Sequence, residues 1–150
     1  MIGLLQRVSS AWVSINNQTV AIIETGLLVL IGVEKNDTKL QADKLLDKIL
    51  GYRVFPDKEG KMNLSLADIN GDLLLVPQFT LPADTKKGMR PSFSSAASPE
   101  LAKKLFEYLL SCARKKRPIV GSGQFGMDMQ VGLTNDGPVT FWLQIPPAKD

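Results

Sequence analysis

The sequence predicts a domain of mixed α and β structure (α/β class), arranged in three β/β/α layers with its helices on one side. Two uninterrupted apolar segments, 26–33 and 72–76, are typical of strands buried on both faces. Each precedes a segment with apolar residues at helical spacing, 38–50 and 98–114. The resulting order, ββ-βα-βα-βββ, is typical of a mixed sheet with helices on one face. No Pro/Gly/Ser-rich linker divides the 150 residues, so we expect one domain over residues 1–150.

The elements of the first half follow from alternation and turn chemistry. Residues 2–8 and 12–15 alternate loosely between apolar and polar side chains, a turn signal occupies 16–18, and 19–23 resumes as a strand. This pattern predicts a hairpin. After the first buried strand, residues 36–38 offer an N-cap for the first helix. The apolar face of that helix comprises Ala42, Leu45, Leu46, Ile49 and Leu50.

In the second half, a short strand at 52–55 and a turn at 57–60 precede the second buried strand, which ends at Pro77. A polar loop, 82–91, then leads to a second helix with Ser98 as its N-cap and a proline at its first position. Three further strands are predicted at 119–120, 127–133 and 139–145.

The composition excludes several kinds of chemistry. The chain contains no histidine, which removes histidine-based triads, histidine general bases and histidine metal ligands. Its single cysteine, Cys112, lies on the apolar face of the second helix and is predicted to be a small core residue; it cannot form an internal disulfide. No carboxylate cluster has metal-ligand spacing, so we expect neither metal nor cofactor. Any catalysis must therefore use hydroxyls, carboxylates, lysines, backbone groups or the substrate itself.

The charge balance is mildly basic, with 18 Lys and Arg against 15 Asp and Glu and a net charge of +3. Lys86, Lys87 and Arg90 crowd one short segment, and residues 114–117 read Arg-Lys-Lys-Arg. On charge alone, a solvated surface explains both groups better than a nucleic-acid contact. The N-terminal residues do not resemble a signal peptide, and the longest apolar run is too short to span a bilayer, so we expect a cytoplasmic protein without a membrane partner.

Three short motifs have weak meaning individually. Residues 121–126 match G-x-G-x-x-G, but a strand-like pattern follows them, which favours a loop over a nucleotide site. The segment 77–81 (PQFTL) places Gln78 and Thr80 at the carboxyl end of a buried strand, where either a binding group or an ordinary polar turn is expected. The segment 135–140 contains Gly-Pro, which is compatible with a cis bond that fixes two carbonyl directions or with an ordinary turn.

Taken together, these segments resemble the D-aminoacyl-tRNA deacylases. The similarity comprises PQFTL at 77–81, GMRPSF at 88–93 and NDGPVTFWLQ at 135–144. It extends in order through Gln6-Arg7-Val8, GLLVLIGVEK at 26–35 and EGKMNLSL at 59–66, and so covers essentially the whole chain. Several segments that match at once are far more specific than any one of them.

The resemblance implies hydrolysis of the ester that joins a D-amino acid, or glycine, to the terminal ribose of tRNA, as a step of translation quality control. It implies a homodimer with sites at the subunit interface. Gly137-Pro138 would be cis and would project into the partner's pocket, where its carbonyls bind the α-amino group and exclude an L side chain. Arg7 would hold this motif in place. D-aminoacyl-tRNA is then the expected partner, with no DNA.

The same resemblance suggests how the ester is cleaved. The backbone N–H groups of Gln78, Phe79 and Thr80 are expected to form an oxyanion hole, while the ribose 2′-hydroxyl positions or activates water. Pro77 departs from the family's common serine, which removes a hydroxyl and an N–H at that position. A rival mechanism uses Thr80 as a covalent nucleophile.

The two basic segments acquire a second interpretation from the resemblance. Lys86, Lys87 and Arg90 become candidate contacts to the tRNA backbone, and for the run 114–117 the two interpretations remain open. A non-catalytic tRNA-binding module is the alternative function, and a small-molecule binding protein is a further one.

Overall fold

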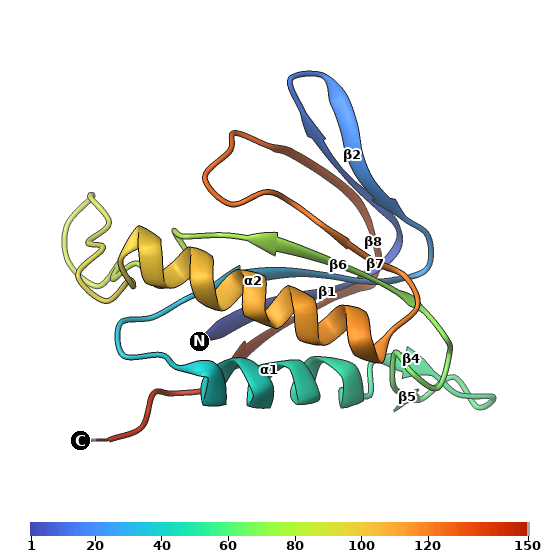
Figure 1. The fold of residues 1–150 in the computed structure, drawn as a ribbon. Helices are drawn as coiled ribbons and strands as arrows, with labels where there is room; N and C mark the ends of the chain where they lie inside the picture. Colours follow the sequence, from blue (N-terminus) through green and yellow to red (C-terminus); the bar gives the residue numbers. More distant parts are fainter. Residues whose placement is uncertain (150) are drawn as a thin grey trace.

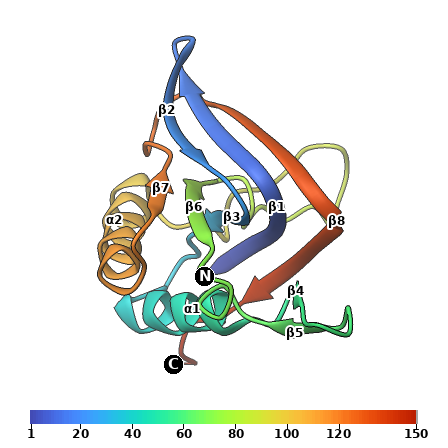
Figure 2. The same cartoon turned by 90° about the vertical axis from the view of Figure 1, so that its right-hand side faces the viewer.

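Two long antiparallel strands, β1 (Ile2–Ile15) and β8 (Gln130–Gln144), organise the sheet in the computed structural model, which describes residues 1–149. The first half of β1 also pairs with β3 (Gly26–Gly32), and its second half pairs with β2 (Gln18–Ile23). The β1–β8 register shifts twice between Gln6 and Ser10. The sheet therefore curls over on itself, as Figure 2 shows.

The centre of the sheet is parallel. β3 pairs with β6 (Asp72–Pro77), which pairs with β7 (Val120–Ser122), giving the order β2-β1-β3-β6-β7 with β8 on β1. Such pairing requires crossovers, and the two helices provide them: α1 (Lys39–Gly51) and α2 (Pro99–Lys116) lie together on one side of the sheet (Figure 1). A small hairpin of β4 (Phe55–Pro56) and β5 (Met62–Leu64) stands apart.

Two hydrophobic clusters define the layers. Leu27 and Leu73 pack into the cluster that includes the helices, whereas their neighbours Leu28 and Leu74 pack into the cluster on the opposite face. That second cluster also contains Val13, from the part of β1 that curls over the sheet. β3 and β6 are thus buried on both faces, which confirms the interpretation of the two apolar segments and the mixed α/β class with helices on one side.

The helix starts are as the sequence predicts. Thr38 caps α1 in a capping box with Gln41, and Ser98 caps α2 by accepting a hydrogen bond from the N–H of Leu101. Cys112 is partly buried against the main core. Within residues 1–149, no helix is long and apolar enough to cross a membrane.

Three details of the predicted order are wrong. The segments 127–133 and 139–145 do not form two strands, because β8 runs through the Gly-Pro segment and accommodates it as a bulge. The strand expected at 52–55 is displaced to β4, since Tyr52 forms the C-cap of α1. β5 was not predicted; its three residues are stabilised by pairing with β4 rather than by their own pattern.

Candidate active site

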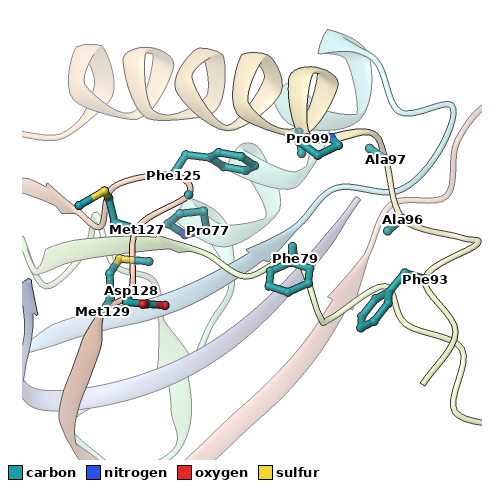
Figure 3. Close-up of a pocket in the computed structure, with 12 residues that line it drawn as sticks. Pro77, Phe79, Phe93, Ala96, Ala97, Pro99, Phe125, Met127, Asp128 and Met129 are labelled. Carbon is teal, nitrogen blue, oxygen red and sulfur yellow. The ribbon is translucent and has the colours of Figure 1, made fainter. Parts of the chain in front are cut away.

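A cavity of about 490 Å³ opens beside the carboxyl end of β6 (Figure 3). Its wall comes from three segments that are distant in sequence: the end of β6, the stretch that leads into α2, and the loop that leads into β8. The lining is mainly apolar, and Asp128 carries its one charged side chain. Figure 3 shows Phe125 and Met129 near Pro77 at one end of the cavity, and Phe79 with Phe93 at the other. The cavity can therefore hold a largely apolar group.

The strand end beside this cavity leaves two backbone donors free. The N–H of Gln78 continues the β6–β3 ladder by donating to the carbonyl of Ile31 at 2.7 Å. The chain then turns, with the N–H of Leu81 donating to the carbonyl of Gln78 at 3.3 Å. Within the described residues 1–149, neither a backbone nor a side-chain acceptor receives the N–H of Phe79 or Thr80. The expectation of three available N–H groups is therefore corrected to two, because the ladder uses that of Gln78.

The hydroxyl of Thr80 is already engaged. The side-chain amide of Gln78 donates to Thr80 Oγ1 at 2.6 Å, and the hydrogen bonds found over residues 1–149 give Thr80 Oγ1 no other partner. An amide nitrogen that donates a proton cannot accept one. The geometry thus provides Thr80 with no general base in this structure, and a nucleophilic role for its hydroxyl lacks support.

The Gly-Pro segment forms a braced protrusion within β8. Gly137 and Pro138 are exposed, the bond between them is cis, and Gly137 has φ of +144°, a value that favours glycine. Arg7 donates through Nε to the carbonyl of Asp136 at 2.9 Å and through Nη1 to the carbonyl of Val54 at 2.7 Å. Arg7 thereby fixes one side of the protrusion to the chain segment just before β4.

Asn135 fixes the other side of the protrusion. Its Oδ1 accepts a hydrogen bond from the N–H of Val139 at 2.8 Å, and its Nδ2 donates to Thr140 Oγ1 at 2.9 Å. The protrusion is thus held by side chains on both sides, whereas its tip lies in solvent. Sequence reasoning did not single out Asn135, because its role depends on a bulge that a strand pattern does not reveal.

The two motifs do not meet within one protomer. β3 and β1 lie between β6 and β8, so three strand spacings, roughly 14 Å in total, separate them across the sheet. The register aligns Pro77 with Ile31, Gly3 and Leu143, and the bulge that contains Gly137 lies opposite Arg7, four residues, roughly 13 Å, further along β1. The strand end at 77–81 and the Gly-Pro protrusion therefore lie apart within one protomer.

The basic segments occupy different places. Lys86, Lys87 and Arg90 are exposed on a loop closed by paired backbone hydrogen bonds between Asp84 and Ser92, next to the cavity. The run 114–117 lies at the opposite end of α2, on the order of 20 Å from the cavity. Lys116 is ion-paired with Asp47, and Arg117 binds Asn70. Two residues of this second run thus have partners within the fold.

Comparison with known proteins assigns the family. A family model described as D-Tyr-tRNA(Tyr) deacylase matches residues 4–144. The chain belongs to this family. A D-aminoacyl-tRNA deacylase of Pseudomonas fluorescens (strain Pf0-1) is 63% identical over 144 residues, which are 96% of this chain and 99% of that protein. One from Thioalkalivibrio sulfidiphilus (strain HL-EbGR7) is 57% identical over 149 residues, covering 99% and 100% of the two chains.

Two solved structures share the fold of this chain. The c-Myc DNA Unwinding Element Binding Protein superposes with a TM-score of 0.93 at 36% identity, covering 97% of this chain and 99% of that one. A probable eukaryotic D-amino acid tRNA deacylase shares the fold, with a TM-score of 0.83 at 19% identity over 96% of this chain and 98% of the other. The resemblance noted in the sequence is therefore confirmed at the level of family and fold.

Several cavity residues of this deacylase-family chain were not anticipated. Phe125 and Gly126 belong to the G-x-G-x-x-G match, which was assigned to a loop; its first two residues lie in β7 and its last four form the loop, and its place in the cavity wall was not predicted. Met129 was assigned to a strand, and Pro99 to a helix start. No sequence signal brings these residues together, because their proximity depends on how α2 and the loop before β8 pack. Within residues 1–149, no group of three or more Cys, Asp or Glu residues is placed to hold a metal ion.

Proposed function

We propose that this chain hydrolyses the ester between a D-amino acid and the terminal ribose of tRNA, releasing the free D-amino acid and the tRNA. The observation that carries the proposal is the pair of free N–H groups, on Phe79 and Thr80, at the edge of an apolar cavity. Two adjacent donors beside a binding cavity are what acyl transfer needs for its oxyanion. The family membership supports the same reaction. This activity would act in translation quality control, in the cytoplasm.

The chemistry uses the backbone and the substrate. Water adds to the ester carbonyl carbon, and the negative charge that develops on the carbonyl oxygen accepts hydrogen bonds from the N–H groups of Phe79 and Thr80. The carbon–oxygen bond to the ribose then breaks, the ribose oxygen takes a proton, and the amino acid leaves as a carboxylate. The neighbouring 2′-hydroxyl positions or activates the water. Pro77 has no N–H and contributes only to the cavity wall.

Discrimination between enantiomers requires the second protomer. We place Gly137 and Pro138 of one copy at the cavity of the other, so that their carbonyls accept hydrogen bonds from the substrate's α-ammonium group. With that group and the ester carbonyl both fixed, the side chain of only one enantiomer has room. Arg7 stiffens the protrusion, which keeps the discrimination sharp. Glycine has no side chain to reject, so glycyl-tRNA is also a substrate.

The direct test measures release of tyrosine from D-tyrosyl-tRNA and from L-tyrosyl-tRNA by the purified full chain. We expect hydrolysis of the D-ester and protection of the L-ester. Equal rates for both esters would overturn the stereochemical part of the proposal. Binding of tRNA without hydrolysis of either ester would instead favour the alternative of a non-catalytic tRNA-binding module.

A mixing experiment tests the shared site. Ala96→Trp fills the cavity of one variant, and Gly137→Ala alters the protrusion of a second variant. Each homodimer lacks a complete site, whereas a mixed dimer contains one intact cavity that faces one intact protrusion. After subunit exchange, we expect recovery of about a quarter of wild-type activity, since half of the dimers are mixed and each has one working site of two. No recovery, despite mixed dimers detected by mass spectrometry, would place both motifs of a site in one protomer.

A further inference from the structure

Two phenylalanine rings lie exposed at the outer end of the cavity. Phe79 is 64% exposed and Phe93 is 43% exposed, and their ring centroids are 5.6 Å apart at an interplanar angle of 40°. The chain's other phenylalanines are buried or half-buried. An apolar aromatic pair left in solvent beside a binding cavity indicates a surface that a ligand covers.

The pair is held in place before any ligand arrives. The backbone on either side of Phe79 is fixed because the N–H of Gln78 donates to Ile31 and the N–H of Leu81 donates to the carbonyl of Gln78. Phe93 follows Ser92, whose two backbone hydrogen bonds to Asp84 are 2.7 and 2.9 Å long, and its own carbonyl accepts from the N–H of Ala96. A preformed surface binds with little cost in ordering.

The charge beside the pair selects the kind of partner. Lys86, Lys87 and Arg90 lie on the loop between Asp84 and Ser92, and none of them forms an ion pair within residues 1–149. The one acidic residue of this loop, Asp84, accepts a hydrogen bond from the backbone N–H of Lys86. Exposed aromatic rings beside unpaired cations are the combination with which proteins bind single-stranded nucleic acid, by stacking on bases and attracting phosphates.

We infer that Phe79 and Phe93 form a stacking surface for the unpaired nucleotide that precedes the aminoacylated nucleotide of tRNA. This inference rests on the proposed function, which places the ester beside the N–H groups of Phe79 and Thr80. Figure 3 shows Phe93 at the end of the cavity away from Phe125 and Met129, so a strand that leaves the cavity at this end passes its ring. The next phosphates then face the loop of Lys86, Lys87 and Arg90. Because every base has a π face, such stacking tolerates different tRNAs.

The test compares a long and a short substrate. Kinetics are measured with D-tyrosyl-tRNA and with D-tyrosyl-adenosine, which lacks the preceding nucleotides, for the wild type, Phe93→Leu and Phe93→Trp. We expect the ratio of kcat/KM for the tRNA to kcat/KM for the adenosine ester to fall about tenfold in Phe93→Leu and to be restored by Phe93→Trp. Leu40→Ala, which alters an exposed apolar residue on α1, is the matched control and should leave the ratio unchanged.

Each alternative has its own signature. An equal loss on both substrates would mean that Phe93 is only a wall of the cavity, and would overturn the inference. A change of sedimentation coefficient in Phe93→Leu would mean that a second copy covers the rings, with the same consequence. If the wild type hydrolyses neither ester, the proposed function fails, yet stacking is still measurable: weaker binding of uncharged tRNA by Phe93→Leu than by Phe93→Trp would support it, and equal binding would overturn it.

Discussion

The strand end at 77–81 and the protrusion at 135–138 differ in what each lacks. The strand end borders a cavity of about 490 Å³ and presents N–H groups without acceptors, but none of residues 77–81 carries a charged side chain. The protrusion is braced by Arg7 and Asn135 and presents a rigid tip, and none of residues 135–138 lines the cavity beside β6. The region at 77–81 is thus a chamber, meaning a cavity with backbone hydrogen-bond donors, whereas the region at 135–138 is an exposed, rigid tip.

This difference is the basis of the proposal that two protomers share a site. Both motifs belong to one curled sheet, whose intervening strands β3 and β1 keep them apart. The sheet is packed between two hydrophobic clusters, and such packing resists bending. In the proposed homodimer, two copies related by a two-fold axis would each contribute a tip to the other's chamber. The four predictions below test this comparison in order of decreasing effect on turnover.

The largest effect is expected from the tip. In Gly137→Ala, the new Cβ would lie 2.6 Å from Val139 Cγ2 and 2.9 Å from the backbone nitrogen of Val139, at a φ that other residues rarely adopt. The tip must shift, and a displacement near 1 Å in a positioning element costs on the order of 100-fold in rate. We expect kcat/KM for D-tyrosyl-tRNA to fall by about that factor. Thermal unfolding should change far less, and a collapse of Tm that accounts for the lost activity would contradict the assignment.

A smaller effect on turnover is expected from a change at Arg7, which holds the protrusion in place. Arg7→Lys retains the charge but cannot donate to the carbonyls of Asp136 and Val54 together, because lysine lacks the planar fork of donors. Loss of one charge-assisted hydrogen bond predicts a decrease of about tenfold in kcat/KM. Since a looser tip also admits the wrong enantiomer, hydrolysis of L-tyrosyl-tRNA should rise. An unchanged ratio of D to L hydrolysis would show that Arg7 does not control the tip.

The strand end beside the cavity should tolerate loss of the Thr80 hydroxyl. If Phe79 and Thr80 act through their N–H groups, Thr80→Ala removes only the hydrogen bond from Gln78, and turnover should fall less than about tenfold. Thr80→Ser serves as the control that keeps the hydroxyl. Near-complete loss of activity in Thr80→Ala, with retained Tm and with Thr80→Ser active, would favour the nucleophilic mechanism.

The smallest effect on turnover is expected from the basic loop. Replacing Lys86, Lys87 and Arg90 with glutamine should leave kcat within about twofold, because these groups contact phosphates rather than reacting atoms. The salt dependence of tRNA binding should flatten by about 0.7 per lost contact in log–log slope, the value for a single strand. Changing Arg114 and Lys115 to glutamine is the matched control. An equal flattening there would move the tRNA contact to the far end of α2.

Local signals in the sequence predicted most of the fold. The caps at Thr38 and Ser98, the turn after β1 and the doubly buried β3 and β6 each depend on neighbours within a few residues, and each is confirmed. The errors lie where long-range contacts decide. β8 continues through Gly137-Pro138 because β1 supplies a partner on both sides of the bulge.

For the candidate site, the sequence by itself predicted which chain segments to consider, namely the strand end after Val76, the Gly-Pro segment and Arg7, and the absence of histidine directed attention to the backbone. Only the tertiary structure decided that the N–H of Gln78 donates to the carbonyl of Ile31 and that Phe125 and Met129 share a cavity with Phe79. It also decided that the strand end and the Gly-Pro segment lie on different parts of the sheet. The physical reason is the separation in sequence between the residues that interact. Caps, turns and buried strands are fixed by interactions between near neighbours in the chain, whereas a cavity and a free donor depend on which distant segments pack together.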